Sequence, residues 1–188
     1  MVDFFSKWLT ANHLTTLRLA LVPFIYTGIV FGEDDQWILL VTWLVFLIAC
    51  LTDYWDGVIA RHQGKATKIG KLLDPVADKI LICSLLILLV AIGRAPAHLT
   101  VILIARELII NGLRSIASAE GVVIDASIGG KSKTITQMLA VGFLIIHYKT
   151  IGLPCHEIGV MMLWIATGIS LWSGYKYIVS YFHNLPKD

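Results

Sequence analysis

Apolar runs alternate with short polar stretches along most of the chain. A run of about 20 apolar residues is what an α-helix needs to cross the hydrocarbon core of a bilayer. The pattern predicts six such helices, at about 14–31, 37–61, 72–92, 97–119, 134–148 and 157–181. The second is longer than a bilayer requires, so its last turns are expected to project into the headgroup region. No strand is predicted, and one domain is expected over residues 1–188.

The first 11 residues differ from the predicted spans because they are short and amphipathic. Their aromatic and leucine side chains fall on one helical face, with charged residues beside it. This pattern is typical of a helix that lies in the membrane interface. We therefore expect an interfacial helix over 1–11 and a six-helix transmembrane bundle over 12–181. The composition agrees with an all-α membrane protein, because 57% of the residues are hydrophobic and the mean hydropathy of +0.77 is too high for an ordinary soluble domain.

Basic residues are distributed unevenly between the two ends of the predicted bundle. With six spans both termini lie on the same side, and most lysines and arginines near the span ends fall there. The opposite turns carry only Arg94 and Lys149. By the positive-inside rule, both termini are predicted to be cytoplasmic.

Four aspartates lie where the second predicted span ends and the third begins: Asp53, Asp56, Asp74 and Asp78. At about 100° per helical residue, each pair shares one helix face. If the loop between them turns the chain back, the four carboxylates converge, and they cannot all stay ionised without cations between them. Oxygen ligands alone favour Mg²⁺ or Mn²⁺. Two such ions can neutralise a pyrophosphate, so the site predicts phosphoryl chemistry on a lipid, but the spacing does not say which carboxylate is the base.

Charged side chains also interrupt the fourth predicted span, where Arg106, Glu107, Asn111 and Arg114 lie within an arc of about 140°. Charges at that depth are costly unless they pair or face a polar cavity. One interpretation is an internal Arg106–Glu107 pair that only fixes helix packing. The other is a pocket for an anionic acceptor, in which Arg106 and Arg114 bind a phosphate and Lys131 reaches in from the following loop.

The aspartates belong to a longer pattern, D-x2-D-G-x2-A-R-x8-G-x3-D-x3-D, which this chain matches at every fixed position from Asp53 to Asp78. The pattern resembles the signature of the CDP-alcohol phosphotransferases. The stretches 14–18, 106–114 and 130–134 are similar to bacterial phosphatidylglycerophosphate synthases within that family. The resemblance covers nearly the whole chain.

The resemblance implies the family's fold and its reaction, the transfer of a phosphatidyl group from CDP-diacylglycerol to sn-glycerol 3-phosphate. The products are phosphatidylglycerophosphate and CMP, in the first committed step of phosphatidylglycerol and cardiolipin synthesis. It also implies a homodimer among membrane lipids, two bound Mg²⁺ or Mn²⁺ ions, and no nucleic-acid partner. The enzyme would be a multi-pass protein of the bacterial inner membrane with a cytoplasmic active site.

The resemblance also assigns roles to individual residues. Asp53, Asp56, Asp74 and Asp78 would bind the metal ions, and Asp78 would also deprotonate the acceptor hydroxyl. The nucleotide-lipid would bind to Asp53, Asp56 and Asp74 together with Gly57, Ala60, Arg61 and Gly70. Thr15 and Arg18 are candidates for lining the site, although Arg18 could equally extend to the headgroups.

Two alternatives remain open. The acceptor could be inositol phosphate, serine, inositol or phosphatidylglycerol, with the same chemistry. A divalent-cation transporter would also use clustered aspartates, but transporter sites usually lie near the bilayer midplane and not at one end of the helices.

Overall fold

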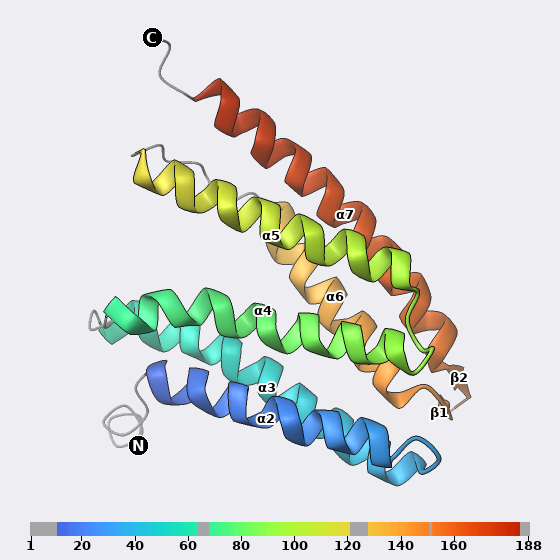
Figure 1. Cartoon of the computed structure of the whole chain (residues 1–188). Helices are drawn as coiled ribbons and strands as arrows, with labels where there is room; N and C mark the ends of the chain where they lie inside the picture. The colour runs from blue at the N-terminus through green and yellow to red at the C-terminus, as the bar shows by residue number, and fades with distance from the viewer. Residues whose placement is uncertain (1–10, 64–67, 121–127, 151, 185–188) are drawn as a thin grey trace.

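The computed structural model describes residues 11–63, 68–120, 128–150 and 152–184, with 11–19, 53–63, 68–78, 118 and 128–131 described by their backbone only. These residues form six helices and one small hairpin (Figure 1). The helices are α2 (Ala11–Phe31), α3 (Gln36–Gln63), α4 (Lys68–Ala91), α5 (Ala97–Ala119), α6 (Ile128–Ile146) and α7 (Cys155–His183). Strands β1 (Lys149–Thr150) and β2 (Leu153–Pro154) pair antiparallel between α6 and α7.

The helices match the six segments that the hydrophobic pattern predicts, and the largely helical architecture is confirmed. The expectation of no strand is wrong at the β1–β2 hairpin. The predicted interfacial helix lies outside the described residues except for Ala11, where α2 begins. The start predicted for the fifth span is also wrong: α6 begins at Ile128, so Lys131 lies on a helix and not in a loop.

The chain runs back and forth between two ends of the bundle, which we call the motif end and the hairpin end. At the motif end α2 begins, α3 ends, α4 begins and α7 ends (left in Figure 1). The hairpin end holds the α2–α3 turn, the α4–α5 turn and the β1–β2 hairpin (right in Figure 1). Helix α2 packs on α3 and α4, α6 packs on α7 and α3, and α5 packs on α7.

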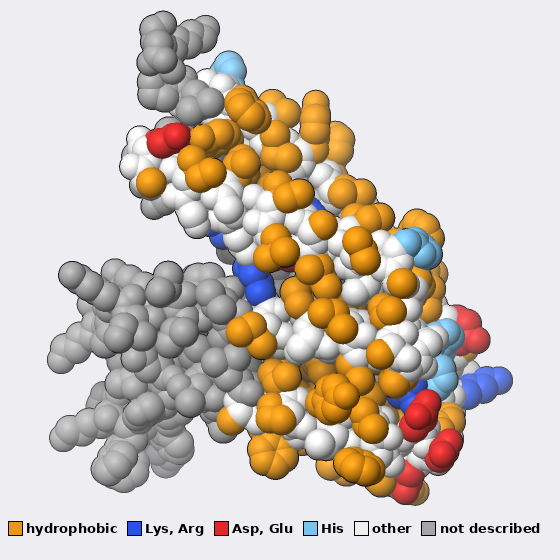
Figure 2. Space-filling model, viewed as in Figure 1, with side chains coloured by type: hydrophobic (Ala, Val, Ile, Leu, Met, Phe, Trp, Pro, Cys, Tyr) orange, Lys and Arg blue, Asp and Glu red, His pale blue; other side chains and the backbone are white. Residues whose placement is uncertain are grey.

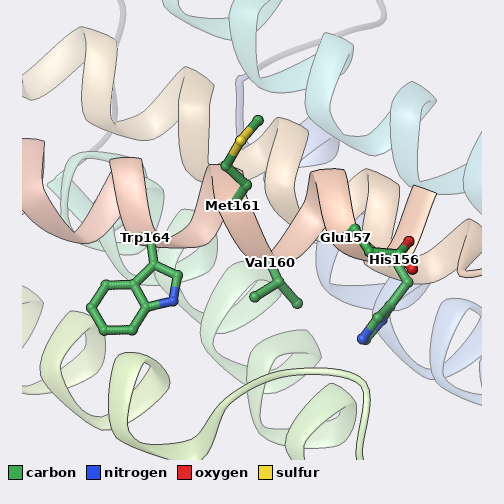
Figure 3. Close-up of a pocket in the computed structure, with 5 residues that line it drawn as sticks. All are labelled: His156, Glu157, Val160, Met161 and Trp164. Carbon is green, nitrogen blue, oxygen red and sulfur yellow. The ribbon is translucent and has the colours of Figure 1, made fainter. Parts of the chain in front are cut away.

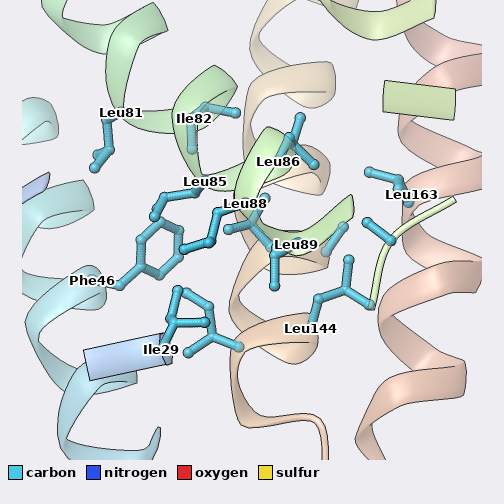
Figure 4. Packing of buried hydrophobic residues seen from close by; sticks show 14 of the residues in the cluster. Ile29, Phe46, Leu81, Ile82, Leu85, Leu86, Leu88, Leu89, Leu144 and Leu163 are labelled. Atoms are coloured by element: carbon cyan, nitrogen blue, oxygen red, sulfur yellow. The ribbon is translucent and has the colours of Figure 1, made fainter. Parts of the chain in front are cut away.

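The hydrophobic core is centred on α4. Its leucines at positions 81, 85, 88 and 89 follow the spacing of one helical face and are almost completely buried. Figure 4 shows them packed against side chains of α2, α3, α6 and α7, namely Ile29, Phe46, Leu144 and Leu163. Helices α6 and α7 approach closely at Gly159, where a Cβ atom would lie 2.8 Å from Leu144 Cγ. Only glycine fits at this crossing.

The outer surface of the helices is apolar. Large exposed hydrophobic side chains occur on all six helices, and Figure 2 shows them spread over the visible face. Such a large apolar surface is unusual for a soluble monomer. Within the described residues, α7 alone is long and apolar enough to cross a membrane, and shorter apolar stretches lie at 20–31, 36–52, 79–91 and 132–146.

Hydrogen bonds join the connections at the hairpin end. Arg94 is 3% exposed and donates to the carbonyl oxygens of Ile145 (3.3 Å) and Glu33 (3.4 Å). The Tyr148 hydroxyl also donates to the Glu33 oxygen, at 2.5 Å. Arg94 thereby links the α2–α3 turn, the α4–α5 turn and the end of α6.

Two histidines pair beside Arg94. The Nδ1 atoms of His147 and His156 lie 3.2 Å apart, so one ring must donate and the other accept. Burial lowers the pKa of His147, and Arg94 and His156 lower it further. His147 also adopts a left-handed backbone conformation (φ 59°), which is uncommon for residues other than Gly.

Candidate active site

The aspartate pattern occupies the last turns of α3 and the first turns of α4, both at the motif end (Figure 1). Asp56 lies seven residues before the end of α3, and Asp74 six residues after the start of α4. Asp53 and Asp78 are each ten residues from those ends. At a rise of 1.5 Å per residue, the first pair lies about 10 Å from the helix ends and the second about 15 Å. Asp56 and Asp74 therefore lie at similar distances from their helix ends, and so do Asp53 and Asp78. The side chains of these four residues are outside the described set, as are those of Gly57, Ala60, Arg61 and Gly70.

Next to this region, Glu107 on α5 gathers three cationic side chains from three helices. Its Oε1 accepts from Arg106 Nη1 at 2.7 Å and from Lys133 Nζ, and its Oε2 lies 3.7 Å from Lys79 Nζ. Only 12% of the Glu107 side chain and 6% of the Lys133 side chain are exposed, so these are not solvated surface charges. We call Lys79, Arg106, Glu107 and Lys133 the Glu107 cluster. Figure 2 shows Lys and Arg atoms beside α5 on the face that it displays.

Helix α7 completes the surroundings of Arg106. Arg106 Nε donates to the Ser170 carbonyl oxygen at 3.0 Å, and Nη2 donates to Ser173 Oγ at 2.7 Å. Gly174 leaves the space that the guanidinium occupies, because a Cβ atom there would lie 3.1 Å from Arg106 Nε. The Arg106–Glu107 pair considered from the sequence is present, and Arg106 also holds α5 against α7.

Of the other residues predicted to bind the acceptor or line the site, only Arg114 has a described side chain. Arg114 is exposed and lies over the Tyr177 ring, 5.8 Å from its centroid. It therefore contacts a different turn of α7 from Arg106. Thr15 and Arg18 lie on α2 near the motif end and Lys131 lies on the first turn of α6, but the side chains of these three residues are outside the described set.

A shallow hollow on α7 lies at the hairpin end, far along the chain from the aspartate pattern. Figure 3 shows its five lining side chains, His156, Glu157, Val160, Met161 and Trp164. Among residues whose side chains are described, no group of three or more His, Cys, Asp or Glu could hold a metal ion, here or elsewhere. The hollow and the aspartate pattern lie at opposite ends of the bundle.

Sequence reasoning missed the partners that come from distant segments. Lys79, Lys133, Ser170 and Ser173 were not among the predicted site residues. A signal was present on α7, where Ser170, Ser173 and Gly174 place small residues on one helical face at i, i+3 and i+4. Small residues on one face of an apolar helix favour close approach of a second helix.

Comparisons with known proteins identify the family to which the chain belongs. Residues 8–172 match the family model described as CDP-alcohol phosphatidyltransferase, and the chain belongs to this family. It is a family of membrane-bound enzymes that generally depend on a divalent metal ion.

Individual relatives cover most of the chain. A protein of Mycobacterium tuberculosis (strain ATCC 25618 / H37Rv) named "Probable phosphatidylglycerophosphate synthase" is 38% identical over 89% of this chain and 79% of its own length. The "CDP-diacylglycerol--glycerol-3-phosphate 3-phosphatidyltransferase" of Bacillus subtilis (strain 168) is 34% identical over 88% of this chain and 91% of its own. The protein of the same name from Rickettsia bellii (strain RML369-C) is 32% identical over 88% and 91%.

Proposed function

We propose that this protein transfers the phosphatidyl group of CDP-diacylglycerol to sn-glycerol 3-phosphate, giving phosphatidylglycerophosphate and CMP. The observation that carries the proposal is that relatives named for this reaction are similar to nearly 90% of the chain. The complete aspartate pattern, on helices that meet at one end of the bundle, supports the same chemistry.

The donor set fits a divalent metal ion. Asp53, Asp56, Asp74 and Asp78 offer only oxygen ligands, which Mg²⁺ and Mn²⁺ prefer, and they lie near the end of α3 and the start of α4. Two bound ions would supply charge neutralisation at the pyrophosphate during transfer. Gly57 and Ala60 would leave room for the nucleotide, while Arg61 and Gly70 would complete its pocket, with Thr15 and Arg18 lining the site.

Asp78 is the proposed base. Its carboxylate takes the proton of the primary hydroxyl of glycerol 3-phosphate. The hydroxyl oxygen forms a bond to the phosphorus that carries diacylglycerol, and the bond from that phosphorus to the bridging oxygen breaks, so that CMP leaves with the electron pair. Arg106, Arg114 and Lys131 are proposed to bind the acceptor's own phosphate. Holding this phosphate away from the reacting centre orients the hydroxyl at the other end of the acceptor.

The membrane arrangement belongs to the same proposal. All six helices would span the bacterial inner membrane as one domain, with an interfacial helix before them. The apolar outer surface supports this arrangement, and it would let the lipid tails of the substrate stay in the bilayer. Both termini and the motif end would face the cytoplasm, and two copies would form a homodimer.

The test uses purified protein in detergent with CDP-diacylglycerol and labelled glycerol 3-phosphate. We expect labelled phosphatidylglycerophosphate with Mg²⁺ or Mn²⁺ and none with a chelator. We also expect glycerol 3-phosphate to be used in preference to serine, inositol, inositol phosphate or phosphatidylglycerol. Asp78→Asn should lower kcat by about 10²–10⁴, the usual contribution of a general base. Asp34→Asn, at the hairpin end, is the matched control and should keep full activity.

Three results would contradict the proposal. The absence of metal-dependent product would overturn the reaction itself. Preference for another alcohol would overturn the acceptor, and full activity of Asp78→Asn would assign the base to another residue.

A further inference from the structure

We propose that Glu107 is a positioning residue for the acceptor, because its carboxylate fixes Arg106 and Lys133 at the spacing that binds the acceptor's phosphate. The inference rests on the proposed function, since it concerns the anionic acceptor of that reaction. It adds Lys133 to the residues that contact the phosphate, and it gives Glu107 a role beyond helix packing.

The first argument is the number of charges on one carboxylate. Arg106 and Lys133 both donate to Glu107 Oε1, and Lys79 lies near Oε2. A carboxylate that only joined two helices would need one cation. Within the described side chains, Arg106 and Lys133 alone exceed the charge of Glu107 by one unit, in a largely buried place where unbalanced charge is costly. An anionic ligand would balance this excess.

The second argument is the number of donors that remain. A guanidinium has five N–H groups and an ammonium has three. Among the described contacts, Arg106 uses one N–H at each of its three nitrogens, and Lys133 uses one. Each Nη atom of Arg106 keeps one N–H, and Lys133 keeps two. Arg106 Nη1 and Lys133 Nζ share one oxygen of Glu107, so donors of both side chains remain close together, and together they could serve the several oxygens of a phosphate.

The third argument is position. Lys79 follows Asp78 directly on α4, so the cluster reaches the helix turn that carries the proposed base. Arg106 is held by α7 on one side and by Glu107 on the other, which leaves it little rotational freedom. Binding groups fixed before the ligand arrives lower the cost of ordering them when it binds. Without Glu107, the long Lys133 side chain would lose the acceptor that holds its ammonium.

The test compares four variants in the same assay: Glu107→Gln, Lys133→Met, the double variant, and Glu120→Gln. Glu120 is the control: it follows α5 directly and accepts from the Tyr181 hydroxyl of α7 at 2.9 Å, and no described contact joins it to the cluster. We expect Glu107→Gln and Lys133→Met each to raise KM for glycerol 3-phosphate by about tenfold, the lower end for losing a hydrogen bond to a charged group. KM for CDP-diacylglycerol should change less than about twofold in both variants, and Glu120→Gln should leave both KM values unchanged.

The double variant separates positioning from an independent effect. If Glu107 acts through Lys133, the double variant should raise KM by clearly less than the product of the two single effects. Multiplicative effects, or a Glu107→Gln enzyme with the KM of Glu120→Gln, would overturn the inference. If Glu107→Gln does not fold, Lys133→Met alone decides, because it retains the Arg106–Glu107 pair, and an unchanged acceptor KM would then overturn the inference. Wild-type protein without activity would overturn the proposed function itself, and this inference with it.

Discussion

Arg94 and Arg106 are both largely buried, and each uses its guanidinium to join helices through main-chain oxygens. Arg94 lies at the hairpin end and donates to the carbonyl groups of Ile145, at the end of α6, and of Glu33, in the α2–α3 turn. Arg106 lies halfway along α5 and bonds both α7 and a carboxylate. The two arginines therefore differ in their partners, because among the described contacts only Arg106 is paired with a carboxylate. Arg94 contacts turns far from the aspartate pattern, whereas Arg106 belongs to a cluster with several charges.

The surroundings of His147 predict a pH effect on stability. Its folded-state pKa is lowered by burial, Arg94 and His156, so the unfolded chain binds a proton more readily than the folded protein. Above the ordinary value of 6.5 both states are neutral and the residue adds no pH dependence. As the pH falls below 6.5, the unfolded state gains the proton first and the folded state loses stability. Glu33 and Glu157 act against this shift but do not reverse it.

We therefore expect the Tm of the wild-type protein in detergent to fall more between pH 7.5 and pH 5.5 than that of His147→Asn. Asparagine is chosen because it tolerates the left-handed backbone at this position. The wild-type protein should show the larger fall, because only its His147 takes up a proton on unfolding in this pH range. Equal falls in Tm for the two proteins would show that His147 does not contribute.

At the scale of elements, the packing of α7 on α6 depends on a glycine contact. The Cβ position at Gly159 meets both the side chain and the backbone nitrogen of Leu144, so the two helices would have to separate to admit a methyl group. Gly168 lies on the same helix with nothing within 4 Å of its Cβ position. The two positions form a matched pair.

We expect Gly159→Ala to lower the Tm by several degrees, because forcing extra volume into a packed contact costs about 1–3 kcal/mol. Gly168→Ala should leave the Tm unchanged or raise it, since alanine favours a helix over glycine by about 1 kcal/mol. Thermal unfolding in the same detergent measures both. A Gly159→Ala protein as stable as Gly168→Ala would contradict the close approach of α6 and α7.

The sequence predicted the elements better than their contacts. Long apolar runs separated by acidic, Gly and Pro residues identify the six helices, because these signals are local. The start of α6 was misplaced because Gly129 and Gly130 are typical of a loop, whereas the first turn of a helix tolerates glycine when packing on α7 favours the helix. The approach of Lys79, Lys133 and Ser173 to Glu107 and Arg106 could not be predicted, because it depends on how four helices pack.

At the scale of the whole molecule, the even number of helices puts the start of α2 and the end of α7 on one side (Figure 1). The aspartate pattern lies on that same side. The proposed orientation places this side in the cytoplasm, where water-soluble glycerol 3-phosphate is used and CMP is released.

The orientation predicts the behaviour of reporter fusions in bacterial cells. A green fluorescent protein after the C-terminus should fluoresce, and an alkaline phosphatase there should be inactive. Phosphatase fused after Asp34 or after Arg94, in the two turns of the hairpin end, should be active. The reverse pattern would overturn the proposed orientation, while equal phosphatase activity after Asp34 and at the C-terminus would contradict an even number of spans.

The bonds of Arg94 and Tyr148 have a mechanical consequence. Three connections are joined by hydrogen bonds at the hairpin end, so we expect a rearrangement that admits a bulky lipid to be smallest at that end and largest at the motif end. An engineered disulfide between neighbouring connections at the hairpin end should therefore leave turnover intact. An engineered disulfide between α4 and α5 near Lys79 should stop turnover.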